Sequence, residues 1–239
     1  MPIILGTLHV ADLWREPRMR IPTQRDWARI PSLLAGTWPE PIHPRVILTP
    51  ERMDAWPEAM VFFEGAEGDD LILDTEYHRE THYLLMLGLG LQGPQGMRGL
   101  QVQWPHLPSY AKEEITTRFT ALVKGRRVIL QNLAADLPVL EQNLHLRPSD
   151  FGPIEDVMLA HACLYSEWPH DLEFLASLYG RYPKMKHLVE EDALLYNWGD
   201  VLETASAWYA LEKELKADPL SERVYREQSL PIALSLLDA

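Results

Sequence analysis

Cysteine is nearly absent from this chain of 239 residues, which contains Cys163 alone. A single cysteine excludes an internal disulfide and a cysteine-rich zinc site, and it favours an intracellular setting. Basic residues are also scarce: 22 lysines and arginines stand against 35 aspartates and glutamates, for a formal net charge of −13. This balance argues against a broad basic surface for duplex nucleic acid. It still allows an acidic site that meets phosphate groups through bound cations.

Long apolar runs are missing as well. The longest covers residues 83–91, well short of the roughly 20 residues that a membrane-spanning helix needs. The first ten residues form only a brief apolar start before several charged residues, a pattern unlike a signal peptide. We therefore expect a chain that works in the cytoplasm without contacting a membrane.

Composition sets the N-terminal part of the chain apart, and the apolar patterns together with the resemblance described below divide the rest into two parts. Residues 1–45 are dense in proline, tryptophan and arginine and show no sustained apolar period, so we predict an N-terminal extension. Residues 46–215 contain the regular apolar patterns of one globular domain. Residues 216–239 have helical spacing and are predicted to form a C-terminal helix.

Apolar patterns in the main domain alternate between strand-like and helix-like segments. Thr49-Pro50 is a favourable helix start, with a capping hydroxyl before a proline at the first position. Strand-like runs cover residues 71–76, 81–91, 99–104 and 126–132. Helical spacing covers residues 50–60, 109–124, 134–144, 155–165, 171–179, 192–214 and 219–236. This order predicts an α/β fold in which helices flank a mixed β-sheet.

A glycine-rich segment at residues 88–93, GLGLQG, fits the G-x-G-x-x-G pattern of dinucleotide-binding proteins. That pattern must open a helix directly after a strand. Here a proline and another glycine follow and lead into the strand-like run at 99–104. We therefore predict a glycine-rich hairpin and no nucleotide-binding turn.

Two carboxylates stand close together in the first strand-like run, Asp74-Thr75-Glu76. Residues two apart on a strand point to the same face, so Asp74 and Glu76 repel each other unless a cation lies between them. Mg²⁺ takes hard oxygen ligands of this kind. A solvated strand end is the commoner explanation for an isolated Asp-x-Glu, so this pattern alone indicates a metal site only weakly.

Two more acidic positions lie in predicted helices. Asp136 falls in the first turn of the helix that follows Gln131-Asn132. A carboxylate is favoured in this turn, so helix capping is by itself a sufficient explanation for Asp136. Tyr196 and Asp200 are four residues apart and therefore share one helix face. An amphipathic core helix with an exposed aspartate explains the second pair equally well.

Together these positions follow the order Asp-x-Glu, Asn-xxx-Asp and Tyr-xxx-Asp. Over residues 46–215 the sequence resembles the DEDD superfamily of 3′→5′ exonucleases, in its tyrosine branch, because Leu195 stands where the other branch has histidine. It is most similar to the proofreading domain of family A DNA polymerases, the bacterial polymerase I type. There the middle motif typically reads Gln-Asn-Leu-x-x-Asp, as residues 131–136 do here. Residues 156–159 and 170–175 resemble two further segments of that family.

The resemblance implies a ribonuclease H-like sheet and a metal-dependent exonuclease that releases nucleoside 5′-monophosphates from single-stranded or frayed DNA 3′ ends. It implies two Mg²⁺ or Mn²⁺ ions with four carboxylate ligands: Asp74, Glu76, Asp136 and Asp200. Tyr196 is expected to stay protonated and to orient the attacking water. The implied setting is a bacterial or phage-infected cell. Residues 221–239 resemble the segment that joins the proofreading domain to a polymerase thumb, so a polymerase domain is an expected partner in the parent chain.

Substrate contacts are predicted for five residues: Thr75, Tyr77, Asn132, Lys184 and Lys186. Tyr77 directly follows Glu76 and is expected to stack on the terminal base. The two lysines belong to a basic cluster that is expected to hold substrate phosphates, although a solvated loop explains this cluster equally well. The family often has an aliphatic wedge where this chain has His-Arg-Glu at residues 78–80, so the contacts with the base depart from the family pattern.

Two other functions stay open. A ribonuclease D-like RNA trimmer belongs to the same tyrosine branch, but it normally carries a helical RNA-binding domain for which we expect no room in this chain. A non-catalytic binding module with the same fold is the second alternative. The intact set of four carboxylates with Tyr196 argues against that module.

Overall fold

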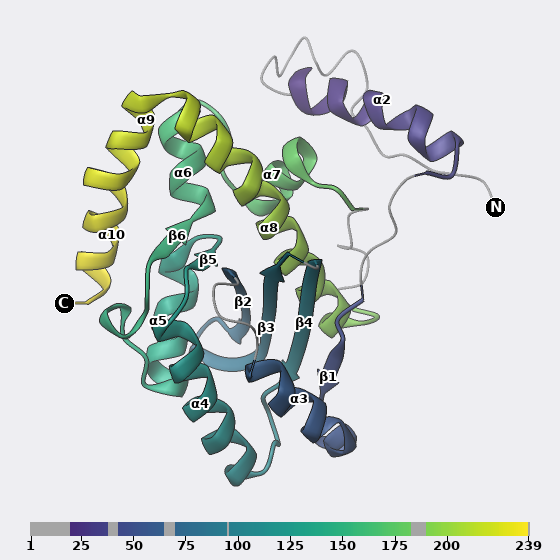
Figure 1. The fold of residues 1–239 in the computed structure, drawn as a ribbon, viewed down its shortest axis with the longest axis vertical. Coiled ribbons are helices and arrows are strands. Elements are labelled where there is room, and N and C mark those ends of the chain that lie inside the picture. The colour runs from purple at the N-terminus through teal and green to yellow at the C-terminus, as the bar shows by residue number, and fades with distance from the viewer. Residues whose placement is uncertain (1–19, 38–42, 65–69, 95, 183–189, 239) are drawn as a thin grey trace.

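A six-stranded sheet forms the centre of the computed structural model, which describes residues 20–37, 43–64, 70–94, 96–182 and 190–238 (Figure 1). The strand order across the sheet is β1-β4-β3-β2-β5-β6. The strands are β1 (Val46–Leu48), β2 (Asp70–His78), β3 (Tyr83–Gly93), β4 (Gly96–Gln103), β5 (Val128–Leu130) and β6 (Ile154–Asp156). β2, β3 and β4 form an antiparallel meander, whereas β1, β5 and β6 each run parallel to a neighbour. The sheet is therefore mixed, as predicted.

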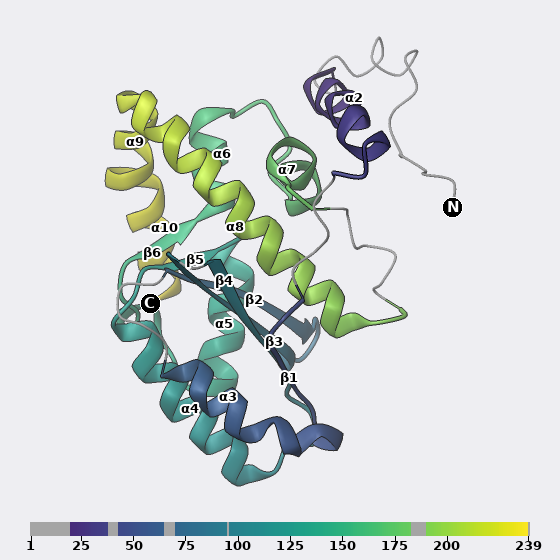
Figure 2. The same ribbon diagram turned by 45° about the vertical axis from the view of Figure 1, so that its right-hand side comes forward.

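Helices cover both faces of this sheet (Figure 2). One long helix, α8, crosses one face, and α3, α4 and α5 cover the other. The helices are α2 (Arg20–Leu34), α3 (Trp56–Phe63), α4 (Ser109–Lys124), α5 (Leu133–Leu144), α6 (Val157–Leu164), α7 (Leu172–Tyr179), α8 (Ala193–Ala217), α9 (Pro219–Val224) and α10 (Leu230–Leu237). Among the described residues, no helix is both long enough and apolar enough to cross a membrane.

Strand β3 presents different side chains to the two helical layers. A Cβ on Gly88 or Gly90 would come within 3.0 Å of side chains from α8. Alternate strand residues face opposite sides, so the fully buried Leu87, Leu89 and Leu91 point to the other layer. The glycine-rich segment thus lies in a hairpin strand, as predicted, and its glycines make room for α8.

Two strands and one helix were not predicted. β1 and β6 have three residues each, which is too few for an alternating pattern to be recognised. α2 lies in the part that was predicted to be an irregular extension. Its Arg25 and Arg29 donate hydrogen bonds to main-chain oxygens at the end of α7, including those of Leu178 and Gly180. The carbonyl groups at the end of α7 have no partner within that helix, so they are available to α2.

The predicted helix at residues 50–60 is interrupted. Pro50–Ala55 forms a 3₁₀ helix in which Arg52 departs from helical geometry at φ −120°, and α3 starts only at Trp56. Pro57 has no amide hydrogen, so a continuous α-helix would lose a hydrogen bond there. The side chain of Thr49 makes no capping hydrogen bond, so its predicted role as a cap is wrong.

The C-terminal segment is helical as predicted, but a π-helical turn at Tyr225–Ser229 separates α9 from α10. Tyr225 is fully buried. Its hydroxyl donates to Glu155 Oε2 at 2.8 Å and accepts from the amide of Asp156 at 2.9 Å. Arg226 pairs with Glu155 at 2.6 Å. This segment therefore contributes to the same core as the sheet.

The contact between α8 and the sheet can be tested at Gly99 of β4. A Cβ on Gly99 would come within 3.0 Å of the ring of Trp198, which is fully buried. We expect Gly99→Ala to lower the free energy of unfolding by about 1–3 kcal/mol, the usual effect of overpacking, as measured by urea denaturation. Gly125→Ala is the matched control, because its Cβ would meet nothing within 4 Å and its φ is −95°. Equal losses in both variants would contradict the close approach of α8.

Candidate metal centre

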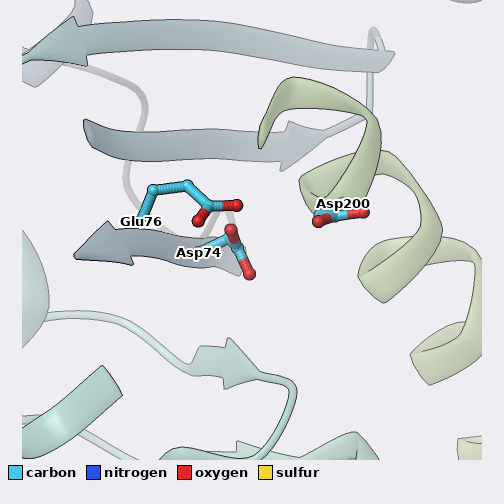
Figure 3. Close-up of side chains that lie close together, drawn as sticks. All are labelled: Asp74, Glu76 and Asp200. Atoms are coloured by element: carbon cyan, nitrogen blue, oxygen red, sulfur yellow. The ribbon is translucent and has the colours of Figure 1, made fainter. Parts of the chain in front are cut away.

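Three of the predicted carboxylates converge where β2 passes α8 (Figure 3). Asp74 and Glu76 extend from the same face of β2, and Asp200 reaches toward them from α8. One oxygen of each carboxylate lies within 4.8 Å of the others. Hard oxygen donors at this spacing suit a divalent cation such as Mg²⁺ or Mn²⁺.

Burial and mutual repulsion disturb the ionisation of this group. Burial, followed by the charges of Asp136, Asp200 and Glu76, raises the pKa of Asp74 well above its ordinary value, and a hydrogen bond from Asn197 partly opposes this. Burial likewise raises the pKa of Glu76. Ionised carboxylates this close together are stabilised by a positive charge among them. The residues present therefore fit a metal ion.

Asp136 is close enough to Asp74 and Glu76 for their charges to interact. It lies next to Thr75 of β2. It is 3% exposed, and its Oδ1 accepts hydrogen bonds from Thr75 N at 3.1 Å and Thr75 Oγ1 at 2.5 Å. Burial raises the pKa of Asp136 to about 7, although the hydrogen bonds from Thr75 lower it. Asp136 is not one of the three residues whose oxygens lie within 4.8 Å of one another. Its role as a metal ligand stays a prediction.

The turn before α5 holds Asp136 in place. Asn132 adopts a left-handed backbone with φ 66°, a conformation in which asparagine is enriched, and its side chain does not cap the helix. The amide of Leu133 donates to Asp156 Oδ2 at 2.5 Å, and the other oxygen of Asp156 accepts from Leu159 N at 2.7 Å. Burial raises the pKa of Asp156 to about 6. Residues 156–159 resemble a segment of the family in sequence, but that resemblance did not predict that Asp156 accepts a hydrogen bond from the turn before α5.

Tyr196 and Asp200 share one face of α8, as their spacing predicted. The hydroxyl of Tyr196 is hydrogen-bonded to Asp200, and burial followed by the charge of Asp200 raises the pKa of the phenol above its usual range. The phenol is therefore protonated at neutral pH. It can donate a hydrogen bond, but it cannot act as a base.

The other predicted contact residues have diverse surroundings. Thr75 is buried, and its hydroxyl donates a hydrogen bond to Asp136. Tyr77 is half-buried, and its ring meets His82 edge-on at a centroid distance of 5.7 Å. Lys184 and Lys186 lie outside the described residues. The substrate contacts of these residues stay predictions.

Asn197 is a residue of the site that sequence reasoning missed. It is fully buried, and its Nδ2 donates to Asp74 Oδ2 at 2.5 Å. A signal was present in the sequence, because an amide stands among apolar and aromatic residues in the segment LLYNW. The Tyr-xxx-Asp pattern specifies only Tyr196 and Asp200, so it assigns no role to Asn197.

Comparisons with known proteins bear on the fold. No protein-family model and no curated protein matches the sequence. Among solved structures, Trypanosoma brucei RNase D in complex with RNA U12 is similar over 70% of this chain, with 12% identity and a TM-score of 0.52. The similar region spans 62% of that chain, less than two thirds of its length.

Two further solved structures have lower TM-scores. The Aedes aegypti Nibbler EXO domain has 11% identity and a TM-score of 0.40, over 81% of this chain and 95% of its own. The EXD2 exonuclease domain soaked in Mn and GMP has 14% identity and a TM-score of 0.33, over 72% of this chain and 94% of its own. The shared fold with RNase D confirms the predicted ribonuclease H-like α/β architecture.

The raised pKa of Asp136 predicts how the metal-free protein responds to pH. The folded state holds the proton up to about pH 7, whereas an unfolded aspartate loses it near pH 4. Stability should therefore fall as pH rises between these values, because the unfolded state then binds fewer protons. One pKa unit corresponds to about 1.4 kcal/mol, so the loss should be on the order of 3 kcal/mol.

Urea unfolding in EDTA at pH 5 and pH 8 measures this effect against Asp136→Asn. The variant should gain stability relative to wild type as pH rises. Burial lowers the pKa of His161 to about 4, but that contribution is common to both proteins and cancels in the comparison. A stability difference that does not change between the two pH values would contradict the raised pKa of Asp136.

Proposed function

We propose that this chain is a metal-dependent 3′→5′ exonuclease that hydrolyses the terminal phosphodiester bond of a nucleic acid and releases nucleoside 5′-monophosphates. The observation that carries the proposal is the convergence of Asp74, Glu76 and Asp200 from two distant segments, with Tyr196 beside them. These residues are the ones that the DEDD motif order singled out. A solvated strand end would not explain why a helix residue 124 positions further along joins the pair.

Asp74, Glu76 and Asp200 would hold Mg²⁺ or Mn²⁺, and Asp136 would contribute to a second ion. When bound, such ions lower the pKa of a coordinated water and stabilise negative charge on the scissile phosphate. Without cations, the acidic centre repels phosphate. Binding of substrate should therefore require added metal.

Tyr196 would orient the attacking water. Its phenol is protonated at neutral pH, because burial and Asp200 raise its pKa. A protonated hydroxyl that is hydrogen-bonded to Asp200 has a defined direction, so it can hold a water beside the scissile phosphate. It does not take the proton of that water.

Single-stranded or frayed DNA 3′ ends are the proposed substrate, as in the proofreading domains of family A polymerases that the motifs resemble. Terminal nucleotides must leave the stack to reach the half-buried carboxylates, so free ends should react faster than duplex ends. Thr75, Tyr77, Asn132, Lys184 and Lys186 are proposed to contact this substrate. On this proposal residues 46–215 form the exonuclease domain, and residues 216–239 lead toward a polymerase domain in a bacterial or phage-infected cell.

RNA is the second candidate substrate. The observation in its favour is the fold shared with Trypanosoma brucei RNase D, whose structure contains RNA. A ribonuclease D-like trimmer would use the same carboxylates, so the sugar preference distinguishes the two functions. A non-catalytic module is disfavoured, because the acidic residues of the motifs and Tyr196 are all present.

Digestion of a 5′-labelled single-stranded DNA oligonucleotide with Mg²⁺, Mn²⁺ or EDTA, beside RNA of the same sequence, tests the proposal. We expect a ladder that shortens from the 3′ end of DNA with either metal and stops in EDTA. Faster shortening of RNA would favour the ribonuclease D-like function. Intact oligonucleotides under all conditions would contradict exonuclease activity.

Substitutions at the site should affect hydrolysis differently at the proposed metal ligands and at the water-orienting tyrosine. Asp74→Ala and Asp200→Ala should abolish hydrolysis, because each removes a carboxylate from the metal centre. Tyr196→Phe should reduce kcat by less than about 10²-fold, the lower limit typical of a group that transfers the proton itself. A Tyr196→Phe variant as inactive as the aspartate variants would refute the water-orienting role.

A further inference from the structure

A buried amide contacts one of the three converging carboxylates. Asn197 is 0% exposed on α8, next to Tyr196, and its Nδ2 donates to Asp74 Oδ2 at 2.5 Å. An ionised carboxylate can only accept hydrogen bonds. The NH₂ group of Asn197 must therefore face Asp74, and its Oδ1 must point away.

The Oδ1 end of Asn197 lies near a second buried amide, that of Gln101 on β4, which is also 0% exposed. Among the described residues, neither polar atom of Gln101 nor Asn197 Oδ1 has a hydrogen-bond partner. Asn197 Oδ1 and Gln101 Nε2 both come within 3.0 Å of the position that a Cβ on Gly88 would take, so they share one small space. Buried polar groups without partners cost stability. Two amides at this place therefore call for a functional reason.

We propose that Asn197 is a positioning residue that fixes the orientation of the Asp74 carboxylate in the metal centre, and that Gln101, as the polar neighbour of Asn197 Oδ1, favours this orientation of the amide. The inference rests on the proposed function, because it takes Asp74 to be a metal ligand. Three carboxylates with oxygens within 4.8 Å of one another repel, so an unrestrained carboxylate would rotate away from the others. A fixed donor at Asp74 Oδ2 opposes that rotation and leaves Oδ1 for the cation.

Gly88 is the part of the strand that makes this arrangement possible. Any side chain at this position would come too close to both amides, because its Cβ would lie within 3.0 Å of Asn197 Oδ1 and Gln101 Nε2. The glycine therefore serves the site as well as the packing of α8. Groups that orient metal ligands typically contribute 10- to 100-fold to metal affinity.

Mn²⁺ affinity of the whole chain, followed by the electron paramagnetic resonance signal of free Mn²⁺, tests the inference without measuring hydrolysis. We expect Asn197→Ala to raise the Kd for Mn²⁺ by about 10- to 100-fold, because the donor to Asp74 is lost. Unchanged Mn²⁺ affinity in this variant would overturn the positioning role. A wild-type chain that binds no Mn²⁺ would overturn the metal centre and this inference with it.

Asn143→Ala is the matched control for destabilisation. Asn143 on α5 makes three hydrogen bonds with the main chain, to Leu84 N, His82 O and Val139 O, and none of these groups belongs to the carboxylate cluster. Its substitution should lower the melting temperature and leave the Kd for Mn²⁺ within about twofold of wild type, since its bonds lie outside the metal centre. An equal loss of affinity in Asn143→Ala would assign the effect of Asn197→Ala to general destabilisation and overturn the inference.

Gln101→Leu tests the second amide. This variant removes two buried polar atoms that have no partner among the described residues, so the protein should be at least as stable as wild type in urea. Its Mn²⁺ affinity should nevertheless fall, because the Asn197 amide loses its polar neighbour. Unchanged affinity would overturn the role of Gln101. If wild type binds Mn²⁺ but digests neither DNA nor RNA, the proposed activity fails, while the Kd values still decide the positioning role.

Discussion

The close approach of α8 to the sheet is the constraint on which the site depends. Gly88, Gly90 and Gly99 present no side chain to this helix, and the space is taken by groups of Asn197, Trp198 and Val201. Larger residues on the strands would push the helix outward. Asp200, one turn beyond Asn197, would then lose its place beside Asp74. The convergence of Asp74, Glu76 and Asp200 is therefore a consequence of packing between one helix and two glycine-containing strands.

This packing assembles acidic groups where they are poorly solvated. Burial is the largest cause of the raised pKa values of Asp74 and Asp136, and neighbouring carboxylates add to it at Asp74. Hydrogen bonds oppose the effect in both cases, from Asn197 to Asp74 and from Thr75 to Asp136. A metal-free centre is thus destabilising on its own, and the apolar core on both faces of the sheet offsets it.

Much of the fold could be predicted from apolar periodicity. The helix at 109–124 has its predicted bounds, and the three long strands lie within a few residues of their predictions. The three-residue strands β1 and β6 could not be predicted, because their pairing is decided by neighbours distant in sequence. The break before Trp56 has a local cause in Pro57, which was overlooked.

The sequence could indicate which residues belong to the candidate site, but it could not indicate how they contact one another. Spacing placed Asp74 with Glu76 and Tyr196 with Asp200, and the motif order suggested that the two pairs meet. The hydrogen bonds from Thr75 to Asp136 depend on the left-handed turn at Asn132, because this turn sets the position of α5. A sequence pattern does not specify that turn. The contact of Asn197 with Asp74 joins residues 123 positions apart, so only the packed structure reveals it.

The most direct test of the central claim is a crystal of the whole chain grown with Mn²⁺ and measured at a wavelength where manganese scatters anomalously. The account predicts an anomalous peak between Asp74, Glu76 and Asp200, at direct coordination distance from their carboxylate oxygens. A difference map with no peak among these three carboxylates, in crystals that bind manganese elsewhere, would contradict it.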